Sequence, residues 1–150
     1  MRCVTQRIRA RDELAQAVTA DLAPDFALFE TRQVTEDWDR VRTELIDLFE
    51  LSRAAAIDEI PVVYVVSSDA LLGREGPGNA MVATGALSAA RTLAAEMRKS
   101  GVPVNVIGTS VETPTIVVAS WVRALATGGP DGPTGELVQL GGTQIGKALS

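Results

Sequence analysis

The sequence predicts an α/β fold, a three-layer sandwich in which helices cover both faces of a parallel sheet of four or five strands. Short apolar runs alternate with longer segments of helical spacing, and the run at 60–66 (IPVVYVV) is almost continuously apolar, as in a strand covered on both faces. Strands that alternate with helices are joined by crossovers and are therefore parallel. The 150 residues suit one domain, and we expect a single domain over 1–150.

Four apolar runs are expected to form the strands of this sheet. They are residues 25–29 (DFALF), 60–66, 102–107 (VPVNVI) and 136–140 (ELVQL). Residues 2–8 are a candidate fifth strand. One alternative is that it lies beside the run at 25–29 and reaches that run through the helix at 12–22 by a right-handed crossover. The other is that a partner covers the exposed edge of the run at 25–29.

Apolar residues spaced three and four apart predict four helices between these strands. The helices are expected at 12–22, 35–57, 79–99 and 113–126. Thr35 is a candidate N-cap for the second helix, and Pro114 suits the first helical position of the fourth. In the third, nine of the residues from 79 to 95 are Ala, Gly or Ser. Such small side chains fit either tight packing on the sheet or close contact with a helix of another subunit.

Two missing residue types limit the chemistry of the chain. It has no histidine, which excludes Ser-His-Asp catalysis, Cys-His catalysis and zinc sites with histidine ligands. All 13 glycines lie at Gly73 or later, which excludes a glycine-rich phosphate cradle near the N-terminus. We therefore expect no metal site and no cofactor-binding residues in this chain.

The charge and the apolar pattern indicate which partners to exclude. The formal net charge is −5, and no basic stripe of the kind that binds nucleic acid is visible. No apolar run is long enough to span a membrane, and the N-terminus lacks the apolar stretch of a secretory signal. The single cysteine, Cys3, is compatible with a reducing compartment. We expect a cytoplasmic protein that binds neither nucleic acid nor membranes.

From Asp25 onward the chain resembles the short-chain dehydrogenase/reductase family over about four-fifths of the sequence, because several pieces occur in the order that the family has. These pieces resemble its fourth strand (25–29), the long helix that follows (36–54), its fifth strand with terminal serines (62–68, VVYVVSS), its sixth helix and strand (87–105) and its last strand (134–142, TGELVQLGG). The resemblance implies a Rossmann-like sheet. It also implies a truncated domain, because the family's first strand and glycine-rich turn have no counterpart of any length.

The resemblance also indicates where the family's catalytic residues should stand. The family uses a Ser, a Tyr thirteen residues later as general acid/base, and a Lys four residues further on. Ser68 stands at the serine position, and the same spacing leads to Met81 and Gly85. Methionine has no titratable proton and glycine has no side chain, so we expect no catalytic residues here and a vestigial Ser68. Tyr64, the only tyrosine, lies within an apolar strand and is expected in the core.

Other positions that the family conserves differ here as well. The family's Asn-Ala-Gly after the fourth strand is replaced by Phe29-Glu30-Thr31. The asparagine of the long helix corresponds to Glu44 or Leu45, and the Pro-Gly after the sixth strand corresponds to Thr109-Ser110.

Helices 35–57 and 79–99 correspond to those through which family members form dimers, and both are full length. The resemblance therefore implies a non-catalytic (pseudoenzyme) subunit of a hetero-oligomeric short-chain dehydrogenase. A full-length catalytic paralogue would dock on these two helices and supply NAD(P), and a bulky hydroxy or keto substrate such as an acyl-CoA would suit such a pair. The alternative is a homodimeric module that binds an apolar small molecule in the vestigial substrate cleft, around Ser68, Met81 and Gly85. An active dehydrogenase that uses unfamiliar residues is the weakest of the three interpretations.

Overall fold

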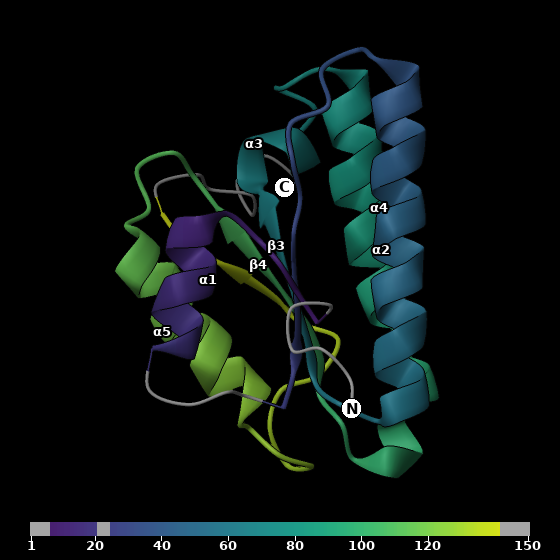
Figure 1. The fold of residues 1–150 in the computed structure, drawn as a ribbon, viewed down its shortest axis with the longest axis vertical. Helices are drawn as coiled ribbons and strands as arrows, with labels where there is room; N and C mark the ends of the chain where they lie inside the picture. Colours follow the sequence, from purple (N-terminus) through teal and green to yellow (C-terminus); the bar gives the residue numbers. More distant parts are fainter. Residues whose placement is uncertain (1–6, 21–24, 142–150) are drawn as a thin grey trace.

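The computed structural model describes residues 7–20 and 25–141. Within them, five parallel strands form one sheet in the order β1-β2-β3-β4-β5 (Figure 1). The strands are β1 (Ile8–Arg9), β2 (Ala27–Glu30), β3 (Val62–Ser67), β4 (Val104–Thr109) and β5 (Leu137–Gln139). The predicted α/β fold with a parallel sheet is confirmed, and the number of strands is five.

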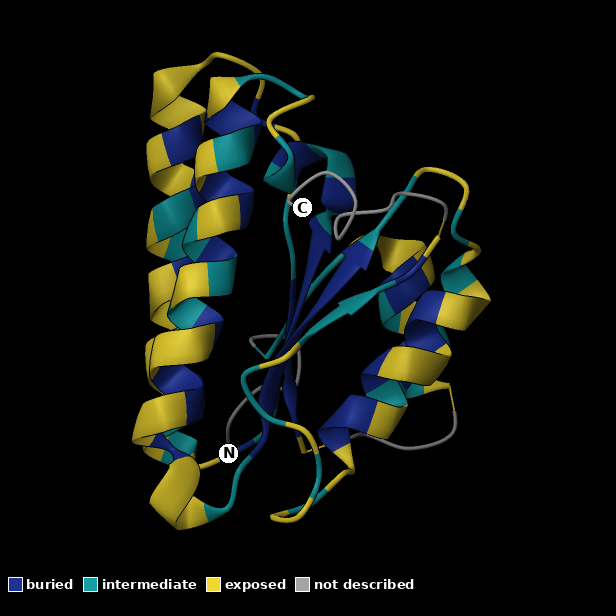
Figure 2. Ribbon diagram, turned by 180° about the vertical axis from the view of Figure 1, so that it is seen from behind, coloured by how far each residue is buried: buried dark blue, intermediate teal, exposed yellow. Residues whose placement is uncertain are grey.

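Helices cover both faces of this sheet, as predicted. They are α1 (Asp12–Thr19), α2 (Trp38–Asp58), α3 (Ser68–Leu71), α4 (Pro77–Glu96) and α5 (Thr115–Ala126), with a 3-10 turn, η2 (Arg98–Ser100), after α4. The long helices α2 and α4 lie side by side on one face, and α1 and α5 lie on the other (Figure 1). The buried sides of all four turn toward the sheet (Figure 2). None of the helices in the described ranges is long and apolar enough to cross a membrane.

The alternation of side chains along each strand divides the core between the two faces. Val62, Tyr64 and Val66 of β3 pack under α2 and α4. Val63 and Val65 of the same strand pack under α1 and α5. All five are at most 2% exposed, which explains why this strand reads as a continuous apolar run rather than as an alternating one.

The predicted fifth strand is present only in part. Ile8 and Arg9 form β1 and pair in parallel with Leu28 and Phe29, whereas residues 2–6 lie outside the described part of the chain. The expected hand of its crossover is wrong. The strands step across the sheet in one direction, so α1 and α2, on opposite faces, belong to crossovers of opposite hand (Figure 1). With the usual right-handed crossover at α2 and α4, the connection through α1 is left-handed.

The reason is that α1 buries its apolar residues on the face opposite to α2. Leu14 and Val18, four residues apart on α1, pack with Phe26 and Leu28 of the β2 segment. Arg123 of α5 also donates a hydrogen bond to the carbonyl oxygen of Ala17, which joins α5 to α1.

Three expected helix starts need correction. The helix expected from 79 begins two residues earlier, at Pro77 of α4. The N-cap of α2 is Asp37 rather than Thr35, and the Asp37 carboxylate accepts hydrogen bonds from the backbone N–H groups of Asp39 (3.1 Å) and Arg40 (3.3 Å). A carboxylate at this position also interacts favourably with the helix dipole, which a threonine hydroxyl does far less. Pro114 is the residue before α5 rather than its first helical residue.

The small residues of α4 serve packing inside this chain. Ala83, Ala86 and Ala90 are buried in the core under the helix. On another side of α4, Gly78 and Gly85 meet α2 and the loop before it. A Cβ atom at Gly78 would lie 2.2 Å from the carbonyl oxygen of Thr35, and one at Gly85 would lie 3.0 Å from Cδ2 of Leu45. Tight packing therefore accounts for much of the small-residue content.

Candidate functional site

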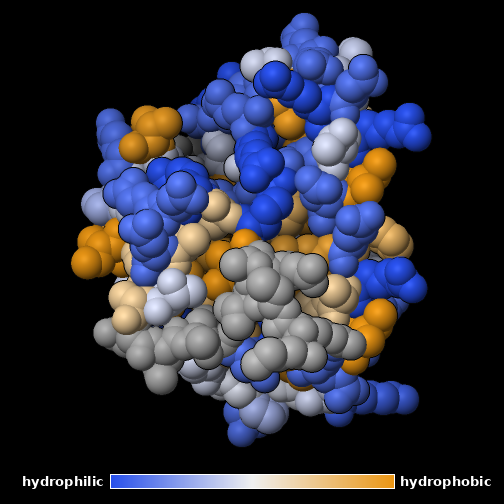
Figure 3. Space-filling model, in the orientation of Figure 1, coloured by the Kyte–Doolittle hydropathy of each residue, from blue (hydrophilic) through white to orange (hydrophobic). Residues whose placement is uncertain are grey.

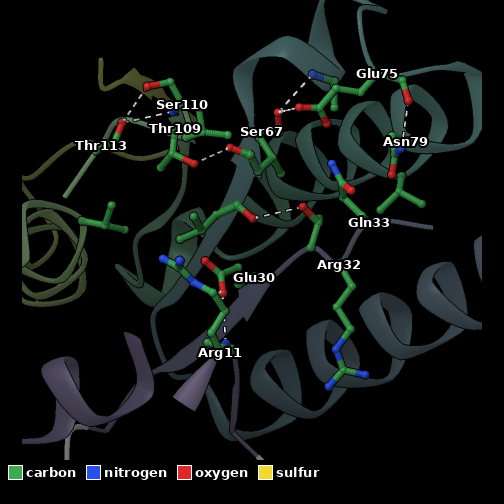
Figure 4. A pocket seen from close by; sticks show the side chains of 18 of the residues that line it. Arg11, Glu30, Arg32, Gln33, Ser67, Glu75, Asn79, Thr109, Ser110 and Thr113 are labelled. Carbon is green, nitrogen blue, oxygen red and sulfur yellow. Dashed lines mark hydrogen bonds and ion pairs between the residues drawn. The ribbon is translucent and has the colours of Figure 1, made fainter. Parts of the chain in front are cut away.

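A polar cleft lies at the carboxyl ends of the strands, between the two helical layers. The chain leaves β1 and β4 toward the α1/α5 layer but leaves β2 and β3 toward the α2/α4 layer. The layers therefore separate at this end of the sheet, which is where ligands bind in parallel α/β folds. The resulting cavity has a volume of about 640 Å³. Figure 4 shows its polar lining, which comes from both layers.

On the α2/α4 side, the polar groups of the cleft bind one another. The Ser67 hydroxyl accepts a hydrogen bond from the N–H of Ala70 (3.2 Å) and donates one to Oε1 of Glu75 (2.8 Å). The Asn79 side chain accepts from the N–H of Val34 (2.9 Å) and donates to the carbonyl oxygen of Glu75 (2.8 Å). Both side chains thus hold the loops around the cleft in place.

The opposite wall has a second set of paired hydroxyl groups. Thr113 Oγ1 accepts a hydrogen bond from the N–H of Ser110 (3.0 Å) and lies 3.2 Å from Ser110 Oγ (Figure 4). It also lies 3.4 Å from the carbonyl oxygen of Leu140. These contacts fix the turn between β4 and α5. The hydroxyl groups of Ser110 and Thr113 therefore brace this turn.

Glu30 and Arg11 form an ion pair at the amino-terminal end of α1. One carboxylate oxygen of Glu30 accepts hydrogen bonds from the backbone N–H (3.0 Å) and from Nε (3.2 Å) of Arg11, the residue immediately before α1. The Glu30 side chain is only 14% exposed. A carboxylate therefore lies at the amino end of α1, where the partial positive charge of the helix dipole favours an anion.

Three arginines in and next to β1 form ion pairs that join this strand to the rest of the fold. These ion pairs were not predicted from the sequence. Arg7, Arg9 and Arg11 alternate along the chain, and each pairs with a carboxylate on another element: Arg7 with Asp25 and Asp58, Arg9 with Glu44 and Asp47, and Arg11 with Glu30. The Arg9 guanidinium also lies 3.9 Å from the centre of the Phe29 ring. The available signal was the period-2 spacing of these arginines, which is the spacing of one face of a strand.

Glu44 is the most buried of these carboxylates, with a side chain that is 5% exposed. It accepts two hydrogen bonds from the Arg9 guanidinium, and its Oε2 lies 2.6 Å from the backbone nitrogen of Arg32. It therefore joins α2 to β1 and to the loop after β2. At one of the two positions that correspond to the family's asparagine, this chain has a structural ion pair.

The structure does not bring together Ser68, Met81 and Gly85, the residues at the family's Ser, Tyr and Lys positions. Ser68 is fully buried, and its hydroxyl accepts a hydrogen bond (2.6 Å) from Nε2 of Gln139, the last residue of β5. Met81 and Gly85 lie on the side of α4 that faces α2 and do not line the cleft. The cleft is lined instead by Glu75, Asn79 and Val82. The expected cavity around Ser68, Met81 and Gly85 therefore needs correction. Ser68 begins α3 and is buried, whereas Met81 and Gly85, four residues apart on α4, share the face of that helix that meets α2.

Tyr64 lies in the core, as predicted. It is 0% exposed, and its hydroxyl oxygen lies 2.6 Å from Oγ of Ser52 on α2. Burial raises the pKa of Tyr64, and the hydrogen bond with Ser52 offsets part of that rise. A raised pKa and a buried position make this hydroxyl a poor acid or base for any reaction in the cleft.

The second candidate site is an apolar groove on the outer side of α2 and α4, which we call the helix-pair surface. It has a volume of about 450 Å³ and is lined by Trp38, Val41, Arg42, Leu45, Ile46, Phe49 and Met81. Trp38 is 54% exposed, Phe49 65% and Met81 49%. In Figure 3, apolar residues interrupt the polar surface at the right-hand edge, where α2 lies. Large apolar side chains grouped in this way mark an interaction surface.

No protein-family model and no curated protein matches the sequence. Solved structures do match. A short-chain dehydrogenase from Mycobacterium smegmatis has a TM-score of 0.62 and 20% identity, over 80% of this chain and 60% of that one. An acetoin dehydrogenase from Enterobacter cloacae has a TM-score of 0.62 and 16% identity, over 87% and 70%. The chain has the fold of the short-chain dehydrogenases.

A halohydrin dehalogenase (HheC), in a complex with ethyl (2S)-oxiran-2-ylacetate, has the same fold as this chain. The TM-score is 0.60 at 21% identity, and the match covers 88% of this chain and 73% of that one. The match with the mycobacterial protein covers 60% of the length of that protein.

The residues at the β1–α1 turn do not fit the NAD(P) that the short-chain dehydrogenase fold implies. A dinucleotide pyrophosphate needs free N–H groups at a helix start and glycines that let the backbone approach it. Here the turn reads Arg9-Ala10-Arg11-Asp12, without glycine, and the N–H of Arg11 is bonded to Glu30. Asp12 and Glu13 add negative charge in the first turn of α1. Among the residues that the structure describes, no cluster of His, Cys, Asp or Glu could hold a metal ion.

Proposed function

We propose that this chain is a non-catalytic subunit of a hetero-oligomeric short-chain dehydrogenase. It docks through the helix-pair surface on a full-length catalytic paralogue that binds NAD(P) and performs the reaction. The observation that carries the proposal is the exposure of Trp38, Phe49 and Met81 on neighbouring sides of α2 and α4. Monomeric soluble proteins rarely expose several large apolar side chains around one groove, because water solvates such surfaces unfavourably.

The cleft supports the same proposal because the residues that line it lack the groups that an oxidoreductase needs for proton transfer. Several of its polar side chains, among them Arg11, Glu30 and Ser67, are bonded within the chain, and the residues that line it include neither tyrosine nor lysine. Arg11, Glu30, Ser67 and Asn79 each hold part of the fold, so none has the free proton-transfer position that an oxidoreductase needs. The catalytic pair and the cofactor therefore come from the partner.

The apolar groove between two long helices supports a partner that itself presents helices, because the ridges of one helix pack into the grooves of another. We therefore propose the equivalent helix pair of a second short-chain dehydrogenase as the docking partner. The partner would carry the first strand, the glycine-rich turn and the Tyr–Lys pair. A bulky hydroxy or keto substrate, such as an acyl-CoA thioester, suits an assembly in which one subunit shapes the pocket of the other.

The test is to co-express the chain with a full-length short-chain dehydrogenase encoded by a neighbouring gene and to measure the mass of the purified complex. We expect a hetero-oligomer with higher activity than the partner has alone. Phe49→Asp should weaken the complex at least 100-fold, because it places a charge in the centre of the groove. The matched control is Ile116→Asp, at an apolar residue of similar exposure (76%) on α5, in the other layer. This control should bind normally.

A stable homodimer with no effect on the partner's activity would overturn the hetero-oligomer. If Phe49→Asp then dissolved that homodimer, the helix-pair surface would join two copies of this chain. A thermal shift with apolar ligands in the absence of any partner would favour the small-molecule module instead.

A further inference from the structure

We propose that Glu30 is a built-in occupant of the phosphate position at the start of α1, and that its carboxylate excludes phosphate-bearing ligands from the cleft. The inference concerns the cleft alone and does not depend on the proposed subunit function. It starts from the disagreement between the cofactor that the fold implies and the residues at the β1–α1 turn.

The first step is the geometry. The carboxylate of Glu30 takes both a backbone N–H and a side-chain N–H of Arg11, at 3.0 and 3.2 Å, through a single oxygen. Arg11 Nη2 also lies 3.4 Å from the hydroxyl of Thr115, at the start of α5. A guanidinium beside a helix start is a donor set that suits a phosphate group. Here a carboxylate of the same chain already fills it.

The second step is that the carboxylate is held in place. Glu30 ends β2, directly beside β1, and the guanidinium of Arg9 donates a hydrogen bond to its backbone carbonyl oxygen (2.7 Å). The backbone position of the Glu30 side chain is therefore fixed. Because Glu30 and Arg11 belong to one chain, their contact does not cost the translational and rotational entropy that binding a separate phosphate would cost. An incoming phosphate would have to displace it and then remain next to a freed carboxylate, in a turn that also contains Asp12 and Glu13.

The third step is that removing the side chain should leave the fold intact. The bond from Arg9 goes to the backbone of Glu30, and β2 pairs with β3 through backbone groups. Glu30→Ala therefore frees the Arg11 donors and removes one of the ion pairs beside β1, but it leaves those of Arg7 and Arg9, which keep β1 in place. Glu30→Gln keeps the shape and removes the negative charge, so it separates the charge effect from the space effect.

The experiment measures pyrophosphate binding to the full chain by titration calorimetry and thermal unfolding at constant ionic strength. We expect at least tenfold tighter binding by Glu30→Ala than by the unaltered chain, with Glu30→Gln between them. In 10 mM pyrophosphate, the unfolding temperature of Glu30→Ala should rise by about 3 °C or more, and that of the unaltered chain should not change. The unaltered chain should also leave NADH fluorescence unchanged at millimolar cofactor.

The matched control is Asp69→Ala, which frees Arg74 from an exposed ion pair (3.3 Å) at some distance from α1. It should bind pyrophosphate no better than the unaltered chain. An equal gain in Asp69→Ala would show that any freed arginine is enough and would overturn the proposal. Tight binding of pyrophosphate or NADH by the unaltered chain would overturn it too, as would the absence of any gain in both Glu30 variants. Docking on the partner should be unchanged in these variants, so the two proposals can fail separately.

Discussion

The cleft and the helix-pair surface are the two places where this fold could bind something, and their side chains differ in kind. In the cleft, carboxylates, hydroxyls and amides bond to one another, as Glu30 does with Arg11 and Asn79 with Val34. On the helix-pair surface, Trp38, Phe49 and Met81 stay exposed around a groove. The difference teaches that the bonded polar groups of the cleft hold the fold together, whereas the apolar side chains around the groove have no cover within the described part of the chain, which is why the docking proposal rests on them.

The largest expected effect comes from Glu44, which joins α2 to β1 and to the loop after β2. Glu44→Gln leaves the buried Arg9 without its main carboxylate, and we expect a loss of about 3–5 kcal/mol in the free energy of unfolding. The measurement is urea denaturation. Glu50→Gln, on the exposed side of the same helix, is the control and should change stability by less than about 0.5 kcal/mol. Equal effects in the two variants would mean that the ion pair between Arg9 and Glu44 does not hold β1.

The next effect concerns the contact between α4 and the loop that leads into α2. Gly78→Ala would place a Cβ atom 2.2 Å from the carbonyl oxygen of Thr35, and we expect a loss of about 1–3 kcal/mol in stability. Gly85→Ala meets only the end of the flexible Leu45 side chain, at 3.0 Å, and gains helix propensity. It should therefore be neutral or slightly stabilising. A large loss in Gly85→Ala would contradict this account of the helix pair.

A smaller effect tests whether α4 contributes to docking as α2 does. Met81→Asp should lower the affinity for the catalytic partner about tenfold while leaving the unfolding temperature nearly unchanged, since Met81 is half exposed. Val111→Asp is the control, because Val111 is fully exposed but lines the cleft. Surface plasmon resonance on both variants compares the two regions directly. If the Val111 variant lost more affinity, the partner would bind over the cleft.

The smallest effect is on the alkaline stability of the chain. Because burial raises the pKa of Tyr64, the unfolded chain ionises this tyrosine first as the pH passes about 10. The contribution of Tyr64 to stability is therefore constant below that pH and falls above it. Tyr64→Phe should cost about 1 kcal/mol at neutral pH through the lost bond with Ser52. The free energy of unfolding of Tyr64→Phe should also decline less steeply between pH 10 and 11.5 than that of the unaltered chain. Identical slopes of stability against pH in the two proteins would place Tyr64 outside the core.

The order of strands and helices could be predicted because apolar periodicity is a local property. The run at 60–66 became β3 nearly residue for residue, since burial on both faces leaves an unmistakable apolar stretch. The β1 strand was only partly predicted, because two residues give no period and arginines at alternate positions resemble a basic tail. The start of α2 was misplaced because Thr35 and Asp37 are both acceptable caps, and only the path of the loop selects between them.

The candidate site could be predicted less well, because it depends on directions that spacing along the chain does not contain. Counting from Ser68 leads to Met81 and Gly85, but the path through α3 and the turn before α4 points these positions toward α2. The sequence did not predict the exposed groove either. Ile46 and Phe49 fall outside the apolar stripe that covers the sheet, and their grouping with Met81 is visible only when α4 lies beside α2.

By itself, the sequence determined the α/β class, the parallel strands, the absence of histidine chemistry and the absence of a glycine-rich turn, because each follows from residue types or from local period. The tertiary structure decided the rest. It placed α1 on the face opposite to α2, it set Glu30 against the start of α1, and it brought Met81 to the groove beside Phe49. Each of these depends on contacts between segments that are far apart in the chain, and such contacts form only when the whole core packs.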